Sequence, residues 1–326
     1  MRRREFLGGL GAAVGAWPFA AHAQPSGKIP IVGFFYPGPK AAASPRSKAF
    51  LAGLRSGGFS EPEKVTLALQ VADGDASLLA PMAADLVARK VDLILAVSSA
   101  AVVAARNATT TIPIVAIDLE SDPVGSGLVS GLARPGGNVT GVFLDFPDFG
   151  KKWLEMLKEA IPQVSAVAVL WDPGTAPIQL NAIRAAAASL NLRLEVFEVR
   201  SRSDLEAAFP AAAQRRVDGI LMLSSVLIGA NTNLLAELAL TQKLPAVTLF
   251  TDFARNGGLM AYGPNLLAHY RQTGVMAAKI LSGAHPAELP IEAPTRFEFV
   301  LNLKTASLLG LLVPPSILLR ADEVIE

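Results

Sequence analysis

The chain has 326 residues, with 29 lysines and arginines, 28 aspartates and glutamates, and a formal net charge of +1. This near-neutral balance favours neither nucleic acid nor an anionic membrane as a partner. Because the sequence contains no cysteine, disulfides, thiolate metal sites and cysteine nucleophiles are excluded. A chain of this length, with 51% hydrophobic residues, can bury a large core, and we expect it to divide into two lobes.

The first residues have the pattern of an export signal. Arg3-Arg4-x-Phe6-Leu7 resembles a twin-arginine signal, and Ala21-His22-Ala23 matches an A-x-A cleavage site. The apolar stretch between them is shorter than the roughly 20 residues of a membrane span and contains Pro18. We therefore expect residues 1–23 to be removed after Ala23 on export to the periplasm. The lack of cysteine excludes a lipid-modified residue at the cleavage site.

Strand-like and helix-like segments alternate along the rest of the chain. Short apolar or alternating runs predict strands at 29–35, 65–71, 93–97, 114–117, 139–144, 166–170, 193–199, 219–223, 246–250 and 296–302. Helical spacing of apolar residues predicts helices at 47–55, 77–89, 99–107, 149–160, 177–190, 205–214, 234–242 and 266–281. Such alternation predicts an α/β fold with βαβ crossovers and parallel sheets covered by helices on both faces.

Two such series follow one another, which predicts two doubly wound, Rossmann-like lobes with a hinge and a ligand cleft between them. We expect the chain to visit lobe 1 a second time, with lobe 1 formed by 28–144 and 264–283, and lobe 2 by 145–263 and 284–326. The Gly-rich segment 258–263 looks like an extended crossover before the last long helix. The hinge is therefore expected near Leu144–Pro147 and Ala261–Pro264.

Sequence motifs for catalysis, cofactors and metals are lacking. Gly9-x-Gly11-x-x-x-Gly15 precedes the first strand, whereas a dinucleotide fingerprint must follow one. There is no G-x-S-x-G nucleophile motif. His269 and His285 have no neighbour at metal-ligand spacing, and we expect both to be exposed to solvent. The sequence thus predicts a protein that is not an enzyme and has neither cofactor nor metal.

In open α/β sheets, ligands bind beyond the carboxyl ends of the strands. Polar or aromatic residues at or near such ends are the candidate ligand-binding residues: Phe35, Tyr36, Ser98, Ser99, Asp118, Phe143, Asp145, Trp171, Ser224, Phe250 and Tyr262. The helix after Ser98-Ser99 has free N–H groups that would hold a carboxylate, although a serine there can equally be only the helix N-cap. Asp118 or Asp145 would meet an ammonium group. The alternative is that the aromatic residues are lobe core and that serines and aspartates hold a polar solute.

Several segments, in order, resemble one family: Ile112-Pro-Ile-Val115, Asp122-Pro-Val124, Gly127-Leu-Val129, 132–141, 257–263, 303–306 and 319–326. They resemble ABC-transporter substrate-binding proteins of the tryptophan/tyrosine-transport type. The resemblance runs from about Ile31 to the C-terminus. It implies a type I periplasmic binding fold and, in some members, aromatic or related amino acids as ligands. We expect a monomer that binds a small carboxylate or amino acid, aromatic or branched ones included, and has membrane permease subunits as partners. The sequence departs from the amino-acid-binding pattern at Ser98-Ser99-Ala100 and Phe143-Leu144-Asp145.

Two other classes of protein share this fold. An enzyme would need a base and nucleophile pair that the sequence lacks. A ligand-sensing regulator would carry a DNA-binding helix-turn-helix where this chain has an export signal.

Overall fold

The structure, a computed structural model, describes residues 28–144 and 146–326. The predicted export signal and Asp145 lie outside these described residues. Among the described helices, none is both long enough and apolar enough to cross a membrane.

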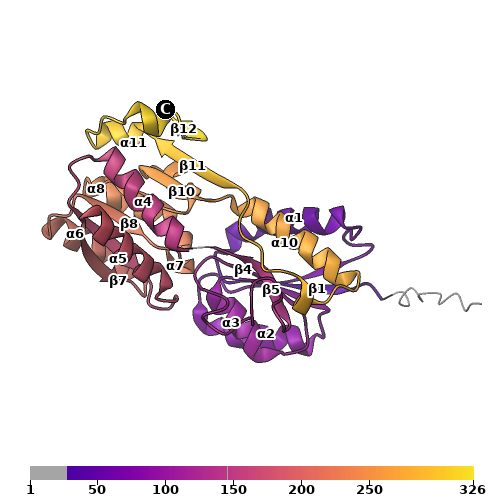
Figure 1. Ribbon diagram of the computed structural model, residues 1–326. Coiled ribbons are helices and arrows are strands. Elements are labelled where there is room, and N and C mark those ends of the chain that lie inside the picture. The colour runs from indigo at the N-terminus through magenta and orange to yellow at the C-terminus, as the bar shows by residue number, and fades with distance from the viewer. Residues whose placement is uncertain (1–27, 145) are drawn as a thin grey trace, which may run out of the picture.

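Lobe 1 is built on a sheet of five parallel strands in the order β2-β1-β3-β4-β5 (Figure 1). The strands are β1 (Ile31–Tyr36), β2 (Thr66–Val71), β3 (Leu93–Val97), β4 (Ile114–Asp118) and β5 (Val139–Phe143). Helices α1 (Lys40–Ser56) and α10 (Leu266–Leu281) cover one face, and α2 (Leu79–Ala88) and α3 (Ser99–Ala108) cover the other, with a 3-10 turn (Ala76–Leu78) before α2. This order is one of the two common doubly wound arrangements.

Alternation along β1 explains why both faces of this sheet are covered. Phe34 packs against Phe50 of α1 and Tyr270 of α10, whereas the next residue, Phe35, belongs to the core cluster on the α2 and α3 face. Successive side chains of a strand point to opposite faces, so an apolar run needs helices on both sides. Helix α1 begins earlier than predicted and continues through Pro45.

Lobe 2 has a seven-stranded sheet in the order β12-β11-β10-β9-β8-β6-β7. Its strands are β6 (Ala166–Trp171), β7 (Arg193–Glu198), β8 (Gly219–Met222), β9 (Ala246–Thr248), β10 (Met260–Pro264), β11 (Phe297–Asn302) and β12 (Glu323–Ile325). Its helices are α4 (Phe146–Ala160), α5 (Ile178–Leu190), α6 (Arg202–Gln214), α7 (Val226–Ala230), α8 (Thr232–Thr241), α9 (Thr251–Arg255), α11 (Leu303–Leu308) and α12 (Pro315–Leu318). Strands β6 to β10 repeat the order of lobe 1, so the prediction of two doubly wound lobes is confirmed.

The last two strands of lobe 2 depart from the all-parallel expectation. Strand β10 ends towards lobe 1 and leads into α10, and the chain then returns along β11, which therefore pairs antiparallel with β10. Residues 258–263 were expected to form an extended crossover before the last long helix. Most of them belong to the extended strand β10, which pairs with β9 and β11 and leads into α10. The C-terminal β12, parallel to β11, has too little apolar patterning to be seen in the sequence.

The chain crosses between the lobes three times. The main chain of 289–292, beyond the expected boundary at residue 284, is hydrogen-bonded to lobe 1. The N–H of Phe143 donates to the carbonyl of Glu292, and the N–H of Glu292 donates to Gly141. A 3-10 turn (Pro286–Glu288) precedes this segment. We propose that lobe 1 includes residues up to Glu292 and that the third crossing comes between Glu292 and Phe297.

Each crossing contributes an aromatic ring to one cluster, here called the hinge aromatic cluster, made of Phe149, Trp153, Tyr262 and Phe297. Phe149 stacks on Tyr262 with ring centroids 5.5 Å apart and lies 4.9 Å from the ring of Phe297. The indole N–H of Trp153 donates to the carbonyl of Tyr262 at 2.7 Å. These rings belong to an apolar cluster that continues into both lobes.

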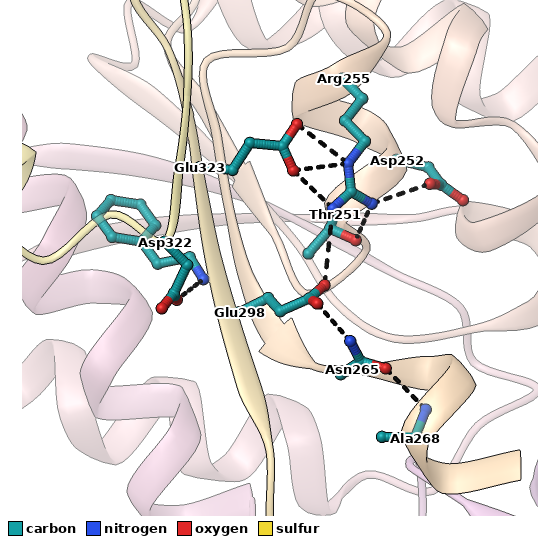
Figure 2. Close-up of polar contacts among 9 residues, drawn as sticks. Thr251, Asp252, Arg255, Asn265, Ala268, Glu298, Asp322 and Glu323 are labelled. Atoms are coloured by element: carbon teal, nitrogen blue, oxygen red, sulfur yellow. Dashed lines mark hydrogen bonds and ion pairs between the residues drawn. The ribbon is translucent and has the colours of Figure 1, made fainter. Parts of the chain in front are cut away.

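A polar chain runs beside the same crossings (Figure 2). Arg255 of α9 donates to Glu323 of β12, with Nη2 2.8 Å from Oε2, and lies 3.7 Å from Glu298 of β11. Glu298 accepts in turn from Asn265, whose Oδ1 accepts from the N–H of Ala268 at 2.7 Å and caps α10. The start of α10 is thereby tied to the edge strands of lobe 2.

Helices α1 and α10 approach so closely that only glycine fits between them. A Cβ added to Gly53 would lie 2.0 Å from the carbonyl oxygen of Arg271, and one added to Gly274 would lie 2.2 Å from that of Phe50. This contact holds α10 against lobe 1 and places Leu266 and Tyr270, which line the cleft between the lobes.

Candidate functional site

Two adjoining cavities lie between the lobes, at the carboxyl ends of the strands. The inner cavity has a volume of about 70 Å³ and is lined from lobe 1 by Tyr36, Arg46 and Glu120 and from lobe 2 by Ser225 and Phe250. The outer cavity, of about 490 Å³, shares Ser98 and Glu120 with it and adds the charged residues Asp73, Asp172 and Arg200. The result is one cleft with a mostly apolar interior and a charged mouth.

The start of α3 forms part of the cleft wall, but its first N–H group is already in use. Ser98 is the N-cap: it has φ of 78°, in the left-handed region, and its Oγ accepts from the N–H of Ala101 at 3.4 Å. Ser99 is the first helical residue, and its N–H donates to Oε2 of Glu120 at 2.9 Å. A carboxylate of the protein itself thus occupies the first N–H group of this helix.

Glu120, in the loop after β4, is the buried acidic residue of the cleft. Its side chain is only 6% exposed. While Oε2 is bonded to Ser99 of lobe 1, Oε1 accepts from the hydroxyl of Ser224 of lobe 2 at 2.9 Å. Burial, together with the charge of nearby Asp118, raises the pKa of Glu120 to about 8.

Ser224 is held in place by Gln179 of α5. The N–H of Ser224 donates to Oε1 of Gln179 at 2.8 Å, and Nε2 of Gln179 donates back to the carbonyl of Ser224 at the same distance. Gln179 is itself buried, so this pair fixes the lobe 2 side of the contact with Glu120.

Asp118 shapes the loop that carries Glu120 and does not line either cavity. Its Oδ1 accepts from the N–H groups of Glu120 and Ser121, at 2.9 and 3.0 Å, and its other oxygen accepts from the Ser121 hydroxyl. Burial raises the pKa of the Asp118 carboxyl, and these hydrogen bonds act in the opposite direction. With its oxygens used in the turn, Asp118 is not placed to meet an ammonium group.

The other predicted residues divide into two groups. Four of them line the cleft, namely Tyr36, Ser98, Ser99 and Phe250, and Ser224 lies behind its wall, bonded to Glu120. Phe35 and Phe143 are instead core residues on the α2 and α3 face of lobe 1.

Trp171 and Tyr262 also lie away from the cavities, and Asp145 is not among the described residues. Trp171 packs against the main apolar cluster, and Tyr262 is part of the hinge aromatic cluster, where Phe149 covers its ring. Phe35, Phe143 and Tyr262 pack in the core or the hinge aromatic cluster, whereas the buried indole N–H of Trp171 has no hydrogen-bond partner among the described residues.

Sequence reasoning missed Arg46 and Glu120. Glu120 lies two residues past the end of β4, within the polar strand end 118–122, but only Asp118 was chosen from that end as a candidate. Arg46 comes from α1 rather than from a strand end, and its guanidinium lies 5.4 Å from the ring centroid of Tyr36. Among the described residues, Arg46 has no acidic partner within ion-pair distance.

The expectation that His269 is exposed to solvent is wrong. This residue, on the buried face of α10, is 1% exposed, and neither ring nitrogen has a hydrogen-bond partner in the described part of the chain. Burial lowers its pKa to about 4, so the ring is neutral. Within 28–144 and 146–326, no group of three or more His, Cys, Asp or Glu side chains is arranged to hold a metal ion.

Chemically, the cleft can hold a small molecule by charge and by apolar contact. Arg46 offers a cation for a carboxylate, Glu120 offers an anion or a neutral carboxyl, and Tyr36, Phe250 and Tyr270 offer ring surfaces. Pockets of this kind, apolar with a few placed polar groups, are typical of small-molecule binding.

Comparison with known proteins identifies the family. Residues 41–325 match the model of the family described as ABC transporter substrate binding protein. A tyrosine-binding protein of Clostridioides difficile (strain R20291) is 25% identical over 266 residues, which cover 81% of this chain and 76% of that protein.

Solved structures agree. An ABC domain from Streptococcus pneumonia in complex with L-Trp superposes with a TM-score of 0.84 at 26% identity, covering 91% of this chain and all of that one. A ligand-free, open substrate binding protein from Clostridium difficile has the same fold, with a TM-score of 0.67 at 24% identity over 91% of this chain and 99% of that one. The family is one of solute-binding proteins of ABC importers rather than of enzymes. With a match over nearly the whole described part, the chain belongs to the ABC transporter substrate binding protein family.

Proposed function

We propose that this receptor binds a small amino acid, or a closely related carboxylate with an apolar or aromatic body, between its two lobes. The observation that carries the proposal is the cleft itself, where an arginine with no ion-pair partner among the described residues and a buried carboxyl line a cavity together with aromatic rings from both lobes. Relatives whose names or bound ligands are tyrosine and tryptophan support this ligand class.

The polar ends of the ligand would be held by residues other than those expected from the sequence. Glu120 already occupies the N–H of Ser99 at the start of α3, and the oxygens of Asp118 are used in its own turn. Arg46 therefore becomes the partner of the ligand carboxylate, and Glu120 becomes the partner of an ammonium group. Tyr36 and Phe250 would contact the apolar part, since both line the inner cavity.

A binding screen followed by one substitution tests this function. The mature protein is heated with amino acids, aromatic acids and nucleosides in turn, because a ligand that binds only the folded state raises the melting temperature. For the compound with the largest shift, Arg46→Ala should weaken binding about 10- to 100-fold in calorimetry, the usual loss for a hydrogen bond to a charged group.

Arg55→Ala is the matched control, because Arg55 is exposed on the same helix and lines none of the described cavities. It should bind as the wild type does. Binding of a neutral polar solute alone, with Arg46→Ala and Arg55→Ala behaving alike, would contradict the proposed ligand class.

We further propose that the protein reaches the periplasm through its paired arginines, acts there as a monomer, and delivers its ligand to membrane permease subunits. The family supports the permease partnership, and the Arg3-Arg4-x-Phe6-Leu7 pattern supports the export route. Changing Arg3 and Arg4 to lysine should leave unprocessed protein in the cytoplasm. Normal export of that variant would show that the general secretory route suffices.

A further inference from the structure

One carboxyl group forms a bridge between the lobes inside the cleft. Glu120 accepts from the main-chain N–H of Ser99 in lobe 1 and from the hydroxyl of Ser224 in lobe 2, each at 2.9 Å. Gln179 holds Ser224 from behind through two hydrogen bonds. All of these groups except Ser99 are at least nine-tenths buried, so the bridge is formed by buried partners.

The surroundings of Glu120 oppose a negative charge. Asp118 of β4 and Asp172, after β6, are the charged groups that act on it most directly, and both raise its pKa. The remaining titratable or charged side chains that line the same cavities come from the other elements around the cleft: Tyr36, Arg46, Asp73, Arg200 and Tyr270. None of the described cations forms an ion pair with Glu120.

We propose that Glu120 is a positioning residue that holds the two lobes together in the ligand-free protein, and that it takes up a proton when the cleft closes around it. In an open cleft the carboxyl faces water and is readily ionised, whereas closure buries it between two lobes without a cation. The bridge survives protonation because a serine hydroxyl both donates and accepts, so Ser224 can accept from the Glu120 O–H.

The pH dependence follows from this proton. In the closed molecule the pKa of Glu120 is about 8, and in an open, hydrated cleft it returns towards its ordinary 4.5. The closed state then binds more protons than the open state, so rising pH disfavours closure. Rising pH should therefore lower the closed-to-open ratio as Glu120 loses its proton. As a consequence that rests on the proposed function, the ammonium group of a ligand would take the place of the proton.

Small-angle X-ray scattering of the ligand-free mature protein tests the proposal without any ligand, so its failure is distinguishable from failure of the proposed function. Between pH 5 and pH 9 the radius of gyration of the wild type should increase as the open form gains population. Glu120→Gln, which is neutral and of the same shape, should remove this pH dependence. Circular dichroism checks that each variant is folded.

Two further variants complete the test. Ser224→Ala loses the lobe 2 partner and should be more open than the wild type at pH 5. Glu155→Gln makes the same chemical change at an exposed position of α4 and should keep the wild-type profile. A radius of gyration that is constant across the pH range in the wild type, or a pH response that persists in Glu120→Gln, would overturn the proposal.

Discussion

The close contact between α1 and α10 determines whether Gly53→Ala stabilises or destabilises the protein. On helix propensity alone, Gly53→Ala should stabilise α1 by about 1 kcal/mol, because alanine loses less backbone entropy on folding than glycine does. In this structure, however, the new Cβ would lie 2.0 Å from the carbonyl oxygen of Arg271 and 2.9 Å from the Cα of Gly274. Both are main-chain atoms, which cannot rotate away.

The size of the clash sets the magnitude. Ordinary van der Waals contacts of a Cβ begin near 3.4 Å, so α1 and α10 would have to separate by roughly 1.4 Å at this point. Overpacking of this kind typically costs about 1–3 kcal/mol and sometimes more. It also opens gaps between neighbouring side chains such as Phe34, Phe50 and Tyr270. We expect the clash to outweigh the propensity gain, with a net loss of about 1–3 kcal/mol.

Urea unfolding followed by circular dichroism measures this loss as a lower midpoint at unchanged slope. Gly150→Ala is the control, because the nearest atom to its Cβ is the terminal side-chain carbon Cδ1 of Ile183, at 3.0 Å, rather than a main-chain atom. It should be close to neutral. A Gly53→Ala protein as stable as the wild type, or more stable, would refute the close approach of the two helices.

Three further substitutions test the hinge, α10 and the edge of lobe 2. Trp153→Phe removes the N–H that meets the Tyr262 carbonyl at 2.7 Å and should lower the free energy of unfolding by about 1–3 kcal/mol, as read from urea midpoints. His269→Leu removes a buried ring whose pKa is lowered to about 4. The unfolded histidine binds a proton near pH 6.5 and the folded one does not. As the pH is lowered from 6.5 to 4, the free energy of unfolding of the wild type should therefore fall by up to about 1.4 kcal/mol per pH unit, and this contribution should be absent in the variant. Asn302→Ala leaves the carbonyl of Ala254 and the N–H of Thr305 without partners and should lower the melting temperature, whereas equal melting temperatures would show that water replaces both contacts.

The sequence predicted the fold well because most of its strands are buried on both faces. Runs such as 93–97 and 166–170 have almost no polar residues, and the helices between them have clear apolar faces. The helices and strands that were not predicted have little apolar patterning of this kind. Short helices, for example Val226–Ala230, and the C-terminal strand β12 are defined by caps and by neighbouring strands rather than by periodicity.

The candidate site was only partly predictable. The rule that ligands bind beyond strand ends correctly placed Tyr36, Ser98, Ser99 and Phe250 around one cleft. It could not separate aromatic residues of the cleft from those of the core, because alternation along a strand places Phe35 and Tyr36 on opposite sides at the same strand end. It also could not foresee that Glu120 would cap α3 in place of a ligand, since that contact joins residues far apart in the sequence.

The hinge aromatic cluster makes the two lobes a single cooperative unit. Its rings continue without a break into the apolar cores on both sides, so neither lobe can melt without exposing part of the surface that stabilises the other. We expect movements of the lobes to be rotations about these stacked rings. A fragment cut at the crossings would lose this shared core, and the three covalent connections alone would not replace it.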